Sequence, residues 1–418
     1  MLQSKLFYKT LKQAPQGAET VSHKLLLKAG FIEQIAAGIY NFLPLGYRVF
    51  RRIEGIIREE MESIGGQEVF LAALQPKRLW QESDRWNKMD PPLFKLKDRH
   101  NKELALGPTH EEVITAMIRG RINSYRDLPF ALYQIQTKFR NEMRATGGLL
   151  RVREFVMKDL YSFHASSQDL DKYYQIVIGA YQKIFTRCGL EAVISEARSG
   201  SIGGSECHEF QLPNKEGEDK ILLCEKCGYA VNQETENTAG SCPSCKQRMA
   251  IVASIELGHV FKLGSLYSKK MGAYFLTKEG KKNPILAGCY GIGLGRLQAA
   301  IIEDQKYHDQ KGMIWPDAVA PFDLHLIEVE SKEDKVSKLA KKVYNTLMDN
   351  HFTVLYDNRN NVSQGEKFVE CDLIGIPVRL VVSKKAGNKI EYKRRDSDAI
   401  KLYGLEELIR KLRAESKS

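Results

Sequence analysis

Arginine and carboxylate side chains stand close together in this 418-residue sequence, in a pattern that suits phosphate and carboxylate chemistry. In "TKFRNEMR", Arg140 and Glu142 are two residues apart at the end of a strand-like run, so we expect them on the same face. A guanidinium can bind a phosphate or a carboxylate through paired hydrogen bonds, and a neighbouring carboxylate can hold the guanidinium in place. A surface ion pair explains the same two residues, and this segment alone favours that simpler interpretation.

A hydroxyl and a carboxylate are placed in the same way in "LGPTHEE", where Thr109 stands two residues before Glu111. Such a pair could hold an ammonium group. A helix that begins at Thr109, with acidic residues in its first turn, explains the segment equally well.

The glycine-rich segment "GCYGIGLGR", residues 288–296, resembles a dinucleotide-binding loop at first sight. That fingerprint requires G-x-G-x-x-G after a first strand, and an acidic residue roughly 20 positions later. Neither requirement is met, so the sequence excludes a dehydrogenase of this type. The glycines instead lead directly into Arg296 and the helix-like run "LQAAII".

Four of the eight cysteines form two pairs, "CEKC" and "CPSC", with 14 residues between the pairs. Four thiolates at this spacing suit a tetrahedral zinc ion. The sequence therefore predicts a small zinc-ribbon-like insertion over residues 218–256, held by Cys224, Cys227, Cys242 and Cys245. Two metal-free turns that carry reduced thiols are the alternative.

The elements that must position these residues can be read from hydrophobic periodicity. Residues 47–64 predict a long amphipathic helix that ends before Gly65. "FALYQIQTKFR" and "REFVMKDLYSFH" predict two strands on either side of the turn "TGG", hence an antiparallel pair with a long basic loop. After Pro321, strand-like and helix-like runs alternate. This alternation predicts a separate α/β domain over 321–418, following a domain over 1–320.

Composition and charge narrow the class of protein. The 43% hydrophobic content and the length suit roughly two or three domains with ordinary cores. No run approaches the roughly 18 apolar residues that a membrane helix needs, and the first residues lack the apolar core of a signal peptide, so we expect a cytoplasmic protein with no membrane partner. The net charge of +11 favours a polyanionic partner such as nucleic acid, although solvated lysine faces produce the same excess.

The order of the segments resembles the three motifs of class II aminoacyl-tRNA synthetases. In finer detail the chain is similar to prolyl-tRNA synthetases of the bacterial type, from residue 1 into the C-terminal domain. This resemblance implies an α+β catalytic domain with the class II antiparallel sheet flanked by helices, and a C-terminal α/β anticodon-binding domain. It further implies a homodimer formed through the motif-one helix, ATP with Mg²⁺, and L-proline and tRNA(Pro) as substrates. The resemblance rests on "GIYNFLPLGYRV", "LGPTHEE", "FRNEMR", "REFVMKDLYSFH", "GSIGGSECHEFQ", "GCYGIGLGR" and "GMIWPDAVAPFD".

The resemblance also implies roles for single residues. Arg140 would contact the α-phosphate of ATP and the proline carboxylate, Arg296 would contact the γ-phosphate, and both would be catalytic. Phe155 would stack on the adenine. The implied ATP-binding residues are Arg140, Glu142, Arg151, Phe155, Gln211 and Arg296. The implied proline-binding residues are Thr109, Glu111, Arg140, Met157, Phe163, His208 and Cys289, the last of which could equally be a small buried hydrophobe.

In the C-terminal domain, the resemblance implies that Arg359, Glu366, Lys367 and Phe368 meet anticodon bases by hydrogen bonding or stacking. A solvated face is the alternative for the three charged residues. Two positions depart from the family pattern. Asn358 replaces an acidic residue, and Gly295 replaces a small hydroxyl residue before the motif-three arginine.

Two other functions are compatible with the same segments. A synthetase-like RNA-binding or regulatory protein would be expected to lose the catalytic arginines, but Arg140 and Arg296 are both present. A threonyl or histidyl ligase is disfavoured by "MKDLYSFH" and "HEFQ". Only 46 residues separate Gln211 from Gly258, so the sequence predicts a short form without a large editing insertion.

Overall fold

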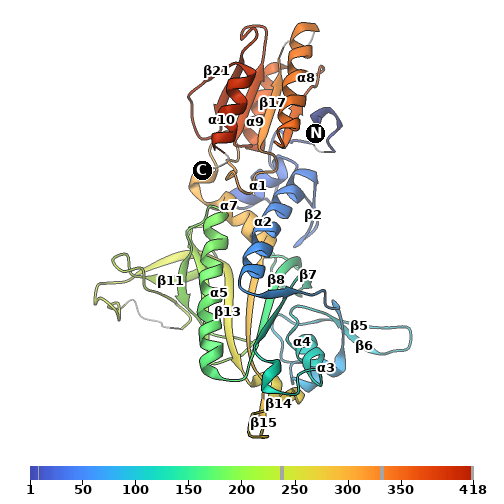
Figure 1. Cartoon of the computed structure of the whole chain (residues 1–418), viewed down its shortest axis with the longest axis vertical. Helices are drawn as coiled ribbons and strands as arrows, with labels where there is room; N and C mark the ends of the chain where they lie inside the picture. Colours follow the sequence, from blue (N-terminus) through green and yellow to red (C-terminus); the bar gives the residue numbers. More distant parts are fainter. Residues whose placement is uncertain (8, 236–239, 330–333, 416–418) are drawn as a thin grey trace. The chain divides into compact units, whose positions relative to one another are not determined.

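The computed structural model describes residues 1–418 except 8, 236–239, 330–333 and 416–418 (Figure 1). The chain forms two compact units. One unit comprises Met1–Gln34, Asn41–Arg52 and Ile301–Ser418, and the other comprises Ile35–Tyr40 and Ile53–Ala300. This division differs from the predicted boundary at residue 320, because the N-terminal residues group with the C-terminal segment.

A nine-stranded sheet organises the larger unit. All of its pairings are antiparallel except β12 with β9 and β3 with β7, which are parallel. The antiparallel class II sheet predicted from the sequence is therefore confirmed. In spatial order the strands are β10 (Glu206–Pro213), β9 (Val193–Glu196), β12 (Ala230–Asn232), β11 (Asp219–Leu223), β13 (Ala250–Gly264), β16 (Leu286–Gly293), β8 (Glu154–His164), β7 (Phe130–Phe139) and β3 (Gly66–Glu68).

Helix α5 (Ser167–Arg187) covers the middle of this sheet, where it contacts β8, β13 and β16 (Figure 1). It begins at Ser166, whose side chain accepts a hydrogen bond from the backbone N–H of Asp169. Tyr174, Tyr181 and Phe185 recur at helical spacing and are fully buried. The apolar face of α5 therefore provides the core on this side of the sheet.

The cysteine-containing segment is built into the sheet. β11 pairs with β13, and β12 pairs with both β11 and β9. β10 also pairs with β13 along Glu206–Pro213, so these five strands close into a ring. The predicted insertion over 218–256 thus extends the catalytic sheet, because the apolar residues Ile221 and Leu222 of β11 are buried in it.

The helix predicted over 47–64 is α2 (Pro44–Ser63). It ends before Gly65, whose φ is 80°. Val49, Ile53, Ile57 and Met61 form its fully buried stripe. The remaining elements from the N-terminus to residue 310 are η1 (Gln3–Lys5), α1 (Val21–Lys28), β1 (Ile32–Ala36), β2 (Ile39–Phe42), β4 (Leu74–Pro76), α3 (Lys77–Glu82), β5 (Phe94–Lys97), β6 (Glu103–Leu106), α4 (Glu111–Ile118), η2 (Tyr125–Asp127), α6 (Leu266–Met271), β14 (Tyr274–Leu276), β15 (Lys282–Pro284), α7 (Leu294–Glu303) and η3 (Gln305–Tyr307).

The smaller unit contains the predicted C-terminal α/β sheet. Its five strands lie in the order β18 (Val354–Asp357), β17 (Leu324–Glu328), β19 (Val378–Val382), β20 (Ile390–Arg394) and β21 (Lys401–Tyr403). The first three are parallel and the last two are antiparallel additions. Helices α8 (Asp334–Asp349), α9 (Gln364–Ile374) and α10 (Leu405–Glu415) complete the unit. No helix within the described part of the chain is both long and apolar enough to span a bilayer.

Candidate active site

Four adjacent strands of the large sheet position the candidate active-site residues. On β8, Phe155, Met157 and Asp159 alternate and therefore share one face. β16 runs beside them, with Gly293 opposite Met157 and Gly291 opposite Asp159. β13 follows β16, and β7 lies on the other side of β8.

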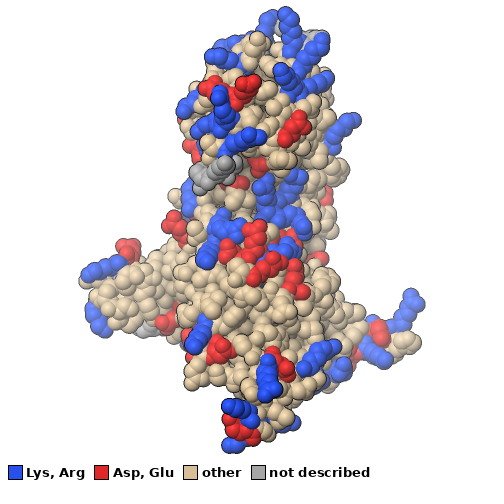
Figure 2. All heavy atoms as spheres, in the orientation of Figure 1, with Lys and Arg blue, Asp and Glu red and all other residues tan. Residues whose placement is uncertain are grey.

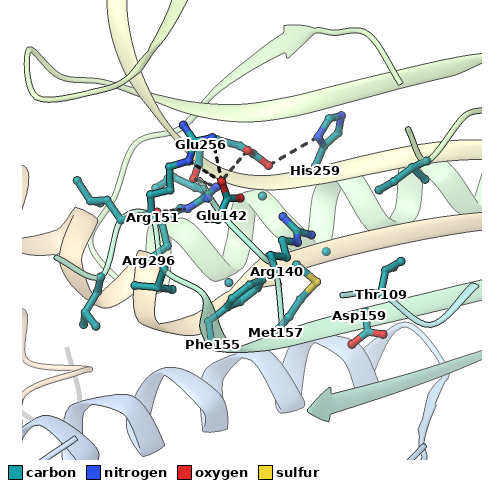
Figure 3. A pocket seen from close by; sticks show the side chains of 18 of the residues that line it. Thr109, Arg140, Glu142, Arg151, Phe155, Met157, Asp159, Glu256, His259 and Arg296 are labelled. Atoms are coloured by element: carbon teal, nitrogen blue, oxygen red, sulfur yellow. Dashed lines mark hydrogen bonds and ion pairs between the residues drawn. The ribbon is translucent and has the colours of Figure 1, made fainter. Parts of the chain in front are cut away.

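A pocket of about 170 Å³ opens on this face of the sheet. Figure 3 shows Arg296, Arg151, Glu142 and Glu256 gathered at one end, Thr109 and Asp159 at the other, and Arg140 between them. Eight residues predicted from the sequence line the pocket: Thr109, Arg140, Glu142, Arg151, Phe155, Met157, Cys289 and Arg296.

Arg140 follows β7 directly and lies over the ring of Phe155, with its guanidinium carbon 5.2 Å from the ring centroid. Its Nε is buried and has no hydrogen-bond partner among the described residues. Burial and the nearby charge of Arg296 lower the pKa of Arg140. A cation whose donor is unused in the protein favours binding of an anion in the pocket.

Arg296 is held at the opposite end from Thr109, in the first turn of α7. Its Nη1 lies 3.0 Å from Oε2 of Glu256, and its Nε donates to the carbonyl of Leu150 at 2.9 Å. A Cβ added at Gly291 or Gly293 would meet only ordinary contacts, at 3.4 and 3.7 Å. Because both glycines line the pocket, their missing side chains keep its floor open.

Glu142 is fixed by Arg151, whose Nη2 lies 3.0 Å from Oε2 of Glu142. The Nη1 of Arg151 contacts Glu218 at 2.9 Å, so Arg151 connects the loop after β7 to the segment before β11. The pairing of Arg140 and Glu142 considered as the simpler interpretation is therefore absent among the described side-chain contacts.

The opposite end of the pocket is built on a buried carboxylate. The hydroxyl of Thr109 donates to Glu111, at 2.7 Å from each carboxylate oxygen. The thiol of Cys289 donates to Oε1 of Glu111 at 3.2 Å, and burial raises the pKa of that thiol well above its usual range. Arg85 approaches Oε2 of Glu111 at 3.3 Å. Glu111 thus stands directly behind two residues that line the pocket.

Besides Glu111, three residues predicted to bind proline or ATP do not line this pocket. Phe163 is buried against Phe130, with ring centroids 5.0 Å apart. His208 contacts the hydroxyl of Tyr174 through Nδ1 at 2.8 Å, and Gln211 donates to Glu209 at 2.8 Å. Their predicted contacts with proline or ATP remain predictions.

Sequence reasoning missed Glu256, His259 and Asp159, all of which line the pocket. Nδ1 of His259 lies 3.5 Å from Glu209 and 3.6 Å from Glu256. Burial opposes its positive charge, but hydrogen bonding to Cys207 and Glu256, together with the charges of Glu256 and Glu209, raises the pKa of His259 to about 9. The sequence did contain a signal that could have identified these three residues, because each is a charged or imidazole group inside a long, mostly apolar strand-like run.

We expect His259 to make stability depend on pH. Because its pKa rises from 6.5 to about 9 on folding, its contribution is fully present below pH 6.5, falls as pH rises, and is lost above about pH 9. The contribution amounts to at most about 3 kcal/mol. His259→Gln should flatten the dependence of melting temperature on pH between 6.5 and 9, whereas His100→Gln, at an exposed position, should not. If melting temperature depended on pH equally in the wild type, His259→Gln and His100→Gln, the assignment of this dependence to His259 would be contradicted.

The four paired cysteines converge outside the pocket. Their sulfur atoms all lie within 4.8 Å of one another, including 3.4 Å between Cys224 and Cys245 and 3.5 Å between Cys227 and Cys242. Four sulfurs around a tetrahedral zinc with bonds of about 2.3 Å would be roughly 3.8 Å apart, so the donor set fits zinc. The two cysteine turns have the same backbone shape. Gly228 and Lys246 each stand four residues after the first cysteine of their pair, and both have a positive φ, of 75° and 61°.

Comparison with protein families defines the class of this site. Residues 94–305 match the tRNA synthetase class II core domain (G, H, P, S and T), and residues 323–415 match the anticodon binding domain. The chain therefore contains a class II aminoacyl-tRNA synthetase core, and the pocket with Arg140 and Arg296 lies within the matched residues.

Comparison with curated proteins defines the family. The chain is 36% identical to the proline–tRNA ligase of Halothermothrix orenii, over 93% of this chain and 94% of that protein. It is 35% identical to the proline–tRNA ligase of Dehalococcoides mccartyi, over 100% and 99% of the two chains. The chain belongs to the prolyl-tRNA synthetase family. These alignments extend over 539 and 568 positions, so the relatives contain long segments without a counterpart in the 418 residues.

Solved structures share the fold. Prolyl-tRNA synthetase from Cryptosporidium parvum, complexed with halofuginone and AMPPNP, superposes with a TM-score of 0.78 at 18% identity. The alignment covers 95% of this chain and 76% of that one. The same enzyme complexed with L-proline and AMP gives a TM-score of 0.77.

Proposed function

We propose that this protein attaches L-proline to tRNA(Pro) at the expense of ATP, through a prolyl-adenylate. The observation that carries the proposal is the position of Arg140, whose Nε has no hydrogen-bond partner in the described part of the chain, between the Thr109 end of the pocket and the Arg296 end (Figure 3). A cation in this position could bind the carboxylate of an amino acid whose ammonium group lies at the Thr109 end. The same cation could bind a phosphate of a nucleotide that reaches Arg296, so the two substrates would be held together for reaction. Incubation of the protein with ATP, labelled proline and tRNA(Pro) should yield acid-precipitable prolyl-tRNA. The absence of this product would overturn the proposal.

In the first step, an oxygen of the proline carboxylate would attack the α-phosphorus of ATP. The bond from that phosphorus to the bridging oxygen would break, and pyrophosphate would leave. Two anions must approach each other, so Arg140 would bind both, and Arg296 would bind the γ-phosphate. Mg²⁺ would arrive bound to ATP and neutralise further phosphate charge.

The proline ammonium would lie at Thr109 and Glu111. Glu111 is buried and already accepts hydrogen bonds from Thr109 and Cys289, so its carboxylate is held in place behind the pocket wall. Met157 lines the pocket beside them and would contact the ring carbons. Phe155 would stack on the adenine near Glu142 and Arg151.

In the second step, the terminal ribose hydroxyl of the tRNA would attack the prolyl carbonyl, and AMP would leave. Of the predicted anticodon-binding residues, Arg359 is paired with Asp357 and Glu370 at 2.7 Å each, and Glu366 is exposed in the first turn of α9. Lys367 is buried and donates to the carbonyl of Glu328 at 2.7 Å. Phe368 lies under Arg379. Of these four residues, Glu366 is exposed, whereas the guanidinium of Arg359 is already engaged by two carboxylates.

The proposal includes the domain and assembly predictions. Residues 1–320 would form the catalytic domain and 321–418 the anticodon-binding domain. The protein would act in the cytoplasm as a homodimer through α2, which presents Tyr47 with 51% of its surface exposed.

The proposal also includes a structural zinc ion. Native mass spectrometry should find the protein heavier than its sequence by one zinc ion, because the four sulfur atoms are already close to tetrahedral spacing. Cys242→Ser should lose the ion, whereas Cys371→Ala, in the other unit, should retain it. A wild-type mass equal to that of the polypeptide after gentle purification would refute the zinc site.

We further expect the enzyme to misacylate tRNA(Pro) with alanine and to leave the product intact. Alanine is smaller than proline, and lost apolar contact discriminates by only about 1–3 kcal/mol. The described residues between 212 and 257 form β11, β12, the cysteine turns and parts of β10 and β13, and a segment of this length leaves little room for a second hydrolytic domain. When preformed alanyl-tRNA(Pro) is incubated with the enzyme, its half-life should equal the spontaneous value. Faster hydrolysis that depends on residues 212–257 would refute this expectation.

A further inference from the structure

A single carboxylate, that of Glu218 in the turn between β10 and β11, holds two points of the loop between β7 and β8. Its Oε1 accepts a hydrogen bond from the hydroxyl of Thr146 at 2.6 Å. Its Oε2 accepts a hydrogen bond from Nη1 of Arg151 at 2.9 Å. Thr146 and Arg151 are five residues apart, so Glu218 fixes both the bend of this loop and its return toward β8.

The loop between β7 and β8 forms one wall of the active-site pocket. Nε and Nη2 of Arg151 contact Oε2 of Glu142 at 3.1 and 3.0 Å, and Figure 3 shows these two residues beside Arg296. The carbonyl of Leu150 accepts the hydrogen bond from Nε of Arg296. The position of the loop therefore determines how Arg151 and Arg296 are presented to the pocket. The loop residues that line the pocket after β7 are Arg140, Glu142, Leu149, Leu150, Arg151 and Val152.

The sequence of the loop does not by itself fix its conformation. Gly147 and Gly148 follow Thr146 directly, and both have a φ of 65°, in the left-handed region. Two consecutive glycines leave many backbone conformations accessible. Met143, before the glycines, is 91% exposed and therefore contributes little packing. A contact from outside the loop is needed to select one conformation.

The turn that carries Glu218 is anchored to the sheet and can supply such a contact. Gly217 lies against β13, where an added Cβ would come within 2.1 Å of the carbonyl oxygen of Ser254. The next residue after Glu218 is Asp219, which begins β11 and pairs with Ser254. Glu218 thus projects from a backbone that is held on β13, and it is a fixed point for the mobile side chain of Arg151.

The negative charge of Glu218 is directed to this arginine. Burial opposes the charge, but hydrogen bonds from Thr146 and Arg151, together with the charge of Arg151, lower the pKa of Glu218 below its usual range. The carboxylate is therefore ionised at neutral pH. Figure 2 shows basic and acidic side chains side by side on the visible face of the segment around β11, without an extended patch of either charge. The individual contacts of Glu218, and not a general acidic surface, thus explain its position.

We propose that Glu218 is a positioning residue for ATP. It holds the loop between β7 and β8 so that Arg151, Glu142 and the carbonyl that orients Arg296 are in place before the nucleotide arrives. Groups that are already ordered do not have to be immobilised on binding, which improves affinity. This inference rests on the proposed function, and it assigns to the segment before the cysteine pairs a role in the use of ATP.

The test measures the KM for ATP and the KM for proline in pyrophosphate exchange. Glu218→Ala should raise the KM for ATP roughly tenfold, the effect of a lost hydrogen bond to a charged group. The KM for proline should stay near the wild-type value, because Thr109 lies at the other end of the pocket. Glu218→Asp keeps the carboxylate and should recover part of the loss. Glu216→Ala is the matched control, since it removes a carboxylate of the same turn that lies 4.0 Å from Lys215.

Two further measurements test the hold on the loop itself. Thr146→Val should raise the KM for ATP in the wild type but not in Glu218→Ala, where the partner of the hydroxyl is already gone. Trypsin should cleave after the exposed Arg144 faster in Glu218→Ala than in Glu216→Ala, because the loop opens more often. The melting temperature should stay near the wild-type value, since an ion pair of two half-exposed side chains contributes little to stability.

The outcomes separate this inference from the proposed function. If the wild-type protein catalyses no proline-dependent pyrophosphate exchange, the proposed function fails. If exchange occurs and Glu218→Ala has the same KM for ATP as Glu216→Ala, only the role of Glu218 is overturned. An equal rise of both KM values, together with a lower melting temperature, would indicate a general disturbance of the fold and would also overturn it.

Discussion

Arg140→Ala should nearly abolish adenylate formation, lowering the rate of proline-dependent pyrophosphate exchange roughly a hundredfold to a thousandfold. The guanidinium lies at the middle of the pocket, over Phe155, and its Nε has no partner among the described residues. Without it, the carboxylate of proline and the α-phosphate of ATP would approach each other with no shared cation.

Two variants keep this prediction specific. Arg187→Ala removes an arginine from an exposed ion-pair cluster with Glu59 and Glu60, and it should leave exchange near the wild-type rate. Arg140→Lys keeps the charge but loses the planar pair of donors, so we expect it to recover only part of the activity. Near-normal exchange by Arg140→Ala would remove Arg140 from the mechanism.

Arg296→Ala should mainly weaken the use of ATP by the enzyme. Its guanidinium is positioned by Glu256 and by the carbonyl of Leu150, at the end of the pocket away from Thr109. We expect kcat/KM for ATP to fall roughly a hundredfold, through loss of a cation at the γ-phosphate. The KM for proline, measured at saturating ATP, should change much less.

The same variant leaves Glu256 beside Glu209 and His259 without its arginine, which could disturb the site by itself. Arg296→Lys retains a charge near Glu256 and serves as the control for this effect. An unchanged KM for ATP in both variants, with normal exchange, would show that Arg296 does not bind the nucleotide.

The strands and helices that carry the site could be predicted because their periodicity is local. β7, β8, α2 and the C-terminal α/β elements were each recognisable within a single window of sequence. Short motifs also led to Arg140 and Arg296, which line one pocket, and to the cysteine cluster, since neighbouring residues of a motif remain neighbours in the fold.

Contacts between distant segments could not be predicted in this way. His259 lies on β13 and depends on Glu209 of β10, and the pairing of these two strands carries no local signal. His259 and Glu256 were overlooked because their strand is mostly apolar. The bridge between Leu2 and Tyr356 of β18 joins distant parts of the chain, and no spacing rule indicates it.

The prediction for Lys367 shows the limit of assigning roles by sequence position. Its segment suggested an exposed base-contacting residue, but burial and the carbonyl of Glu328 occupy its ammonium. The exposed carboxylate near this position is Glu366, which lines a pocket together with Lys9 of the N-terminal segment.

Proline specificity is the central claim, and pyrophosphate exchange measured separately with each common amino acid tests it most directly. We predict that proline supports exchange at a low concentration, that alanine supports it weakly, and that threonine and histidine do not support it. Exchange with threonine or histidine, and none with proline, would contradict the assignment.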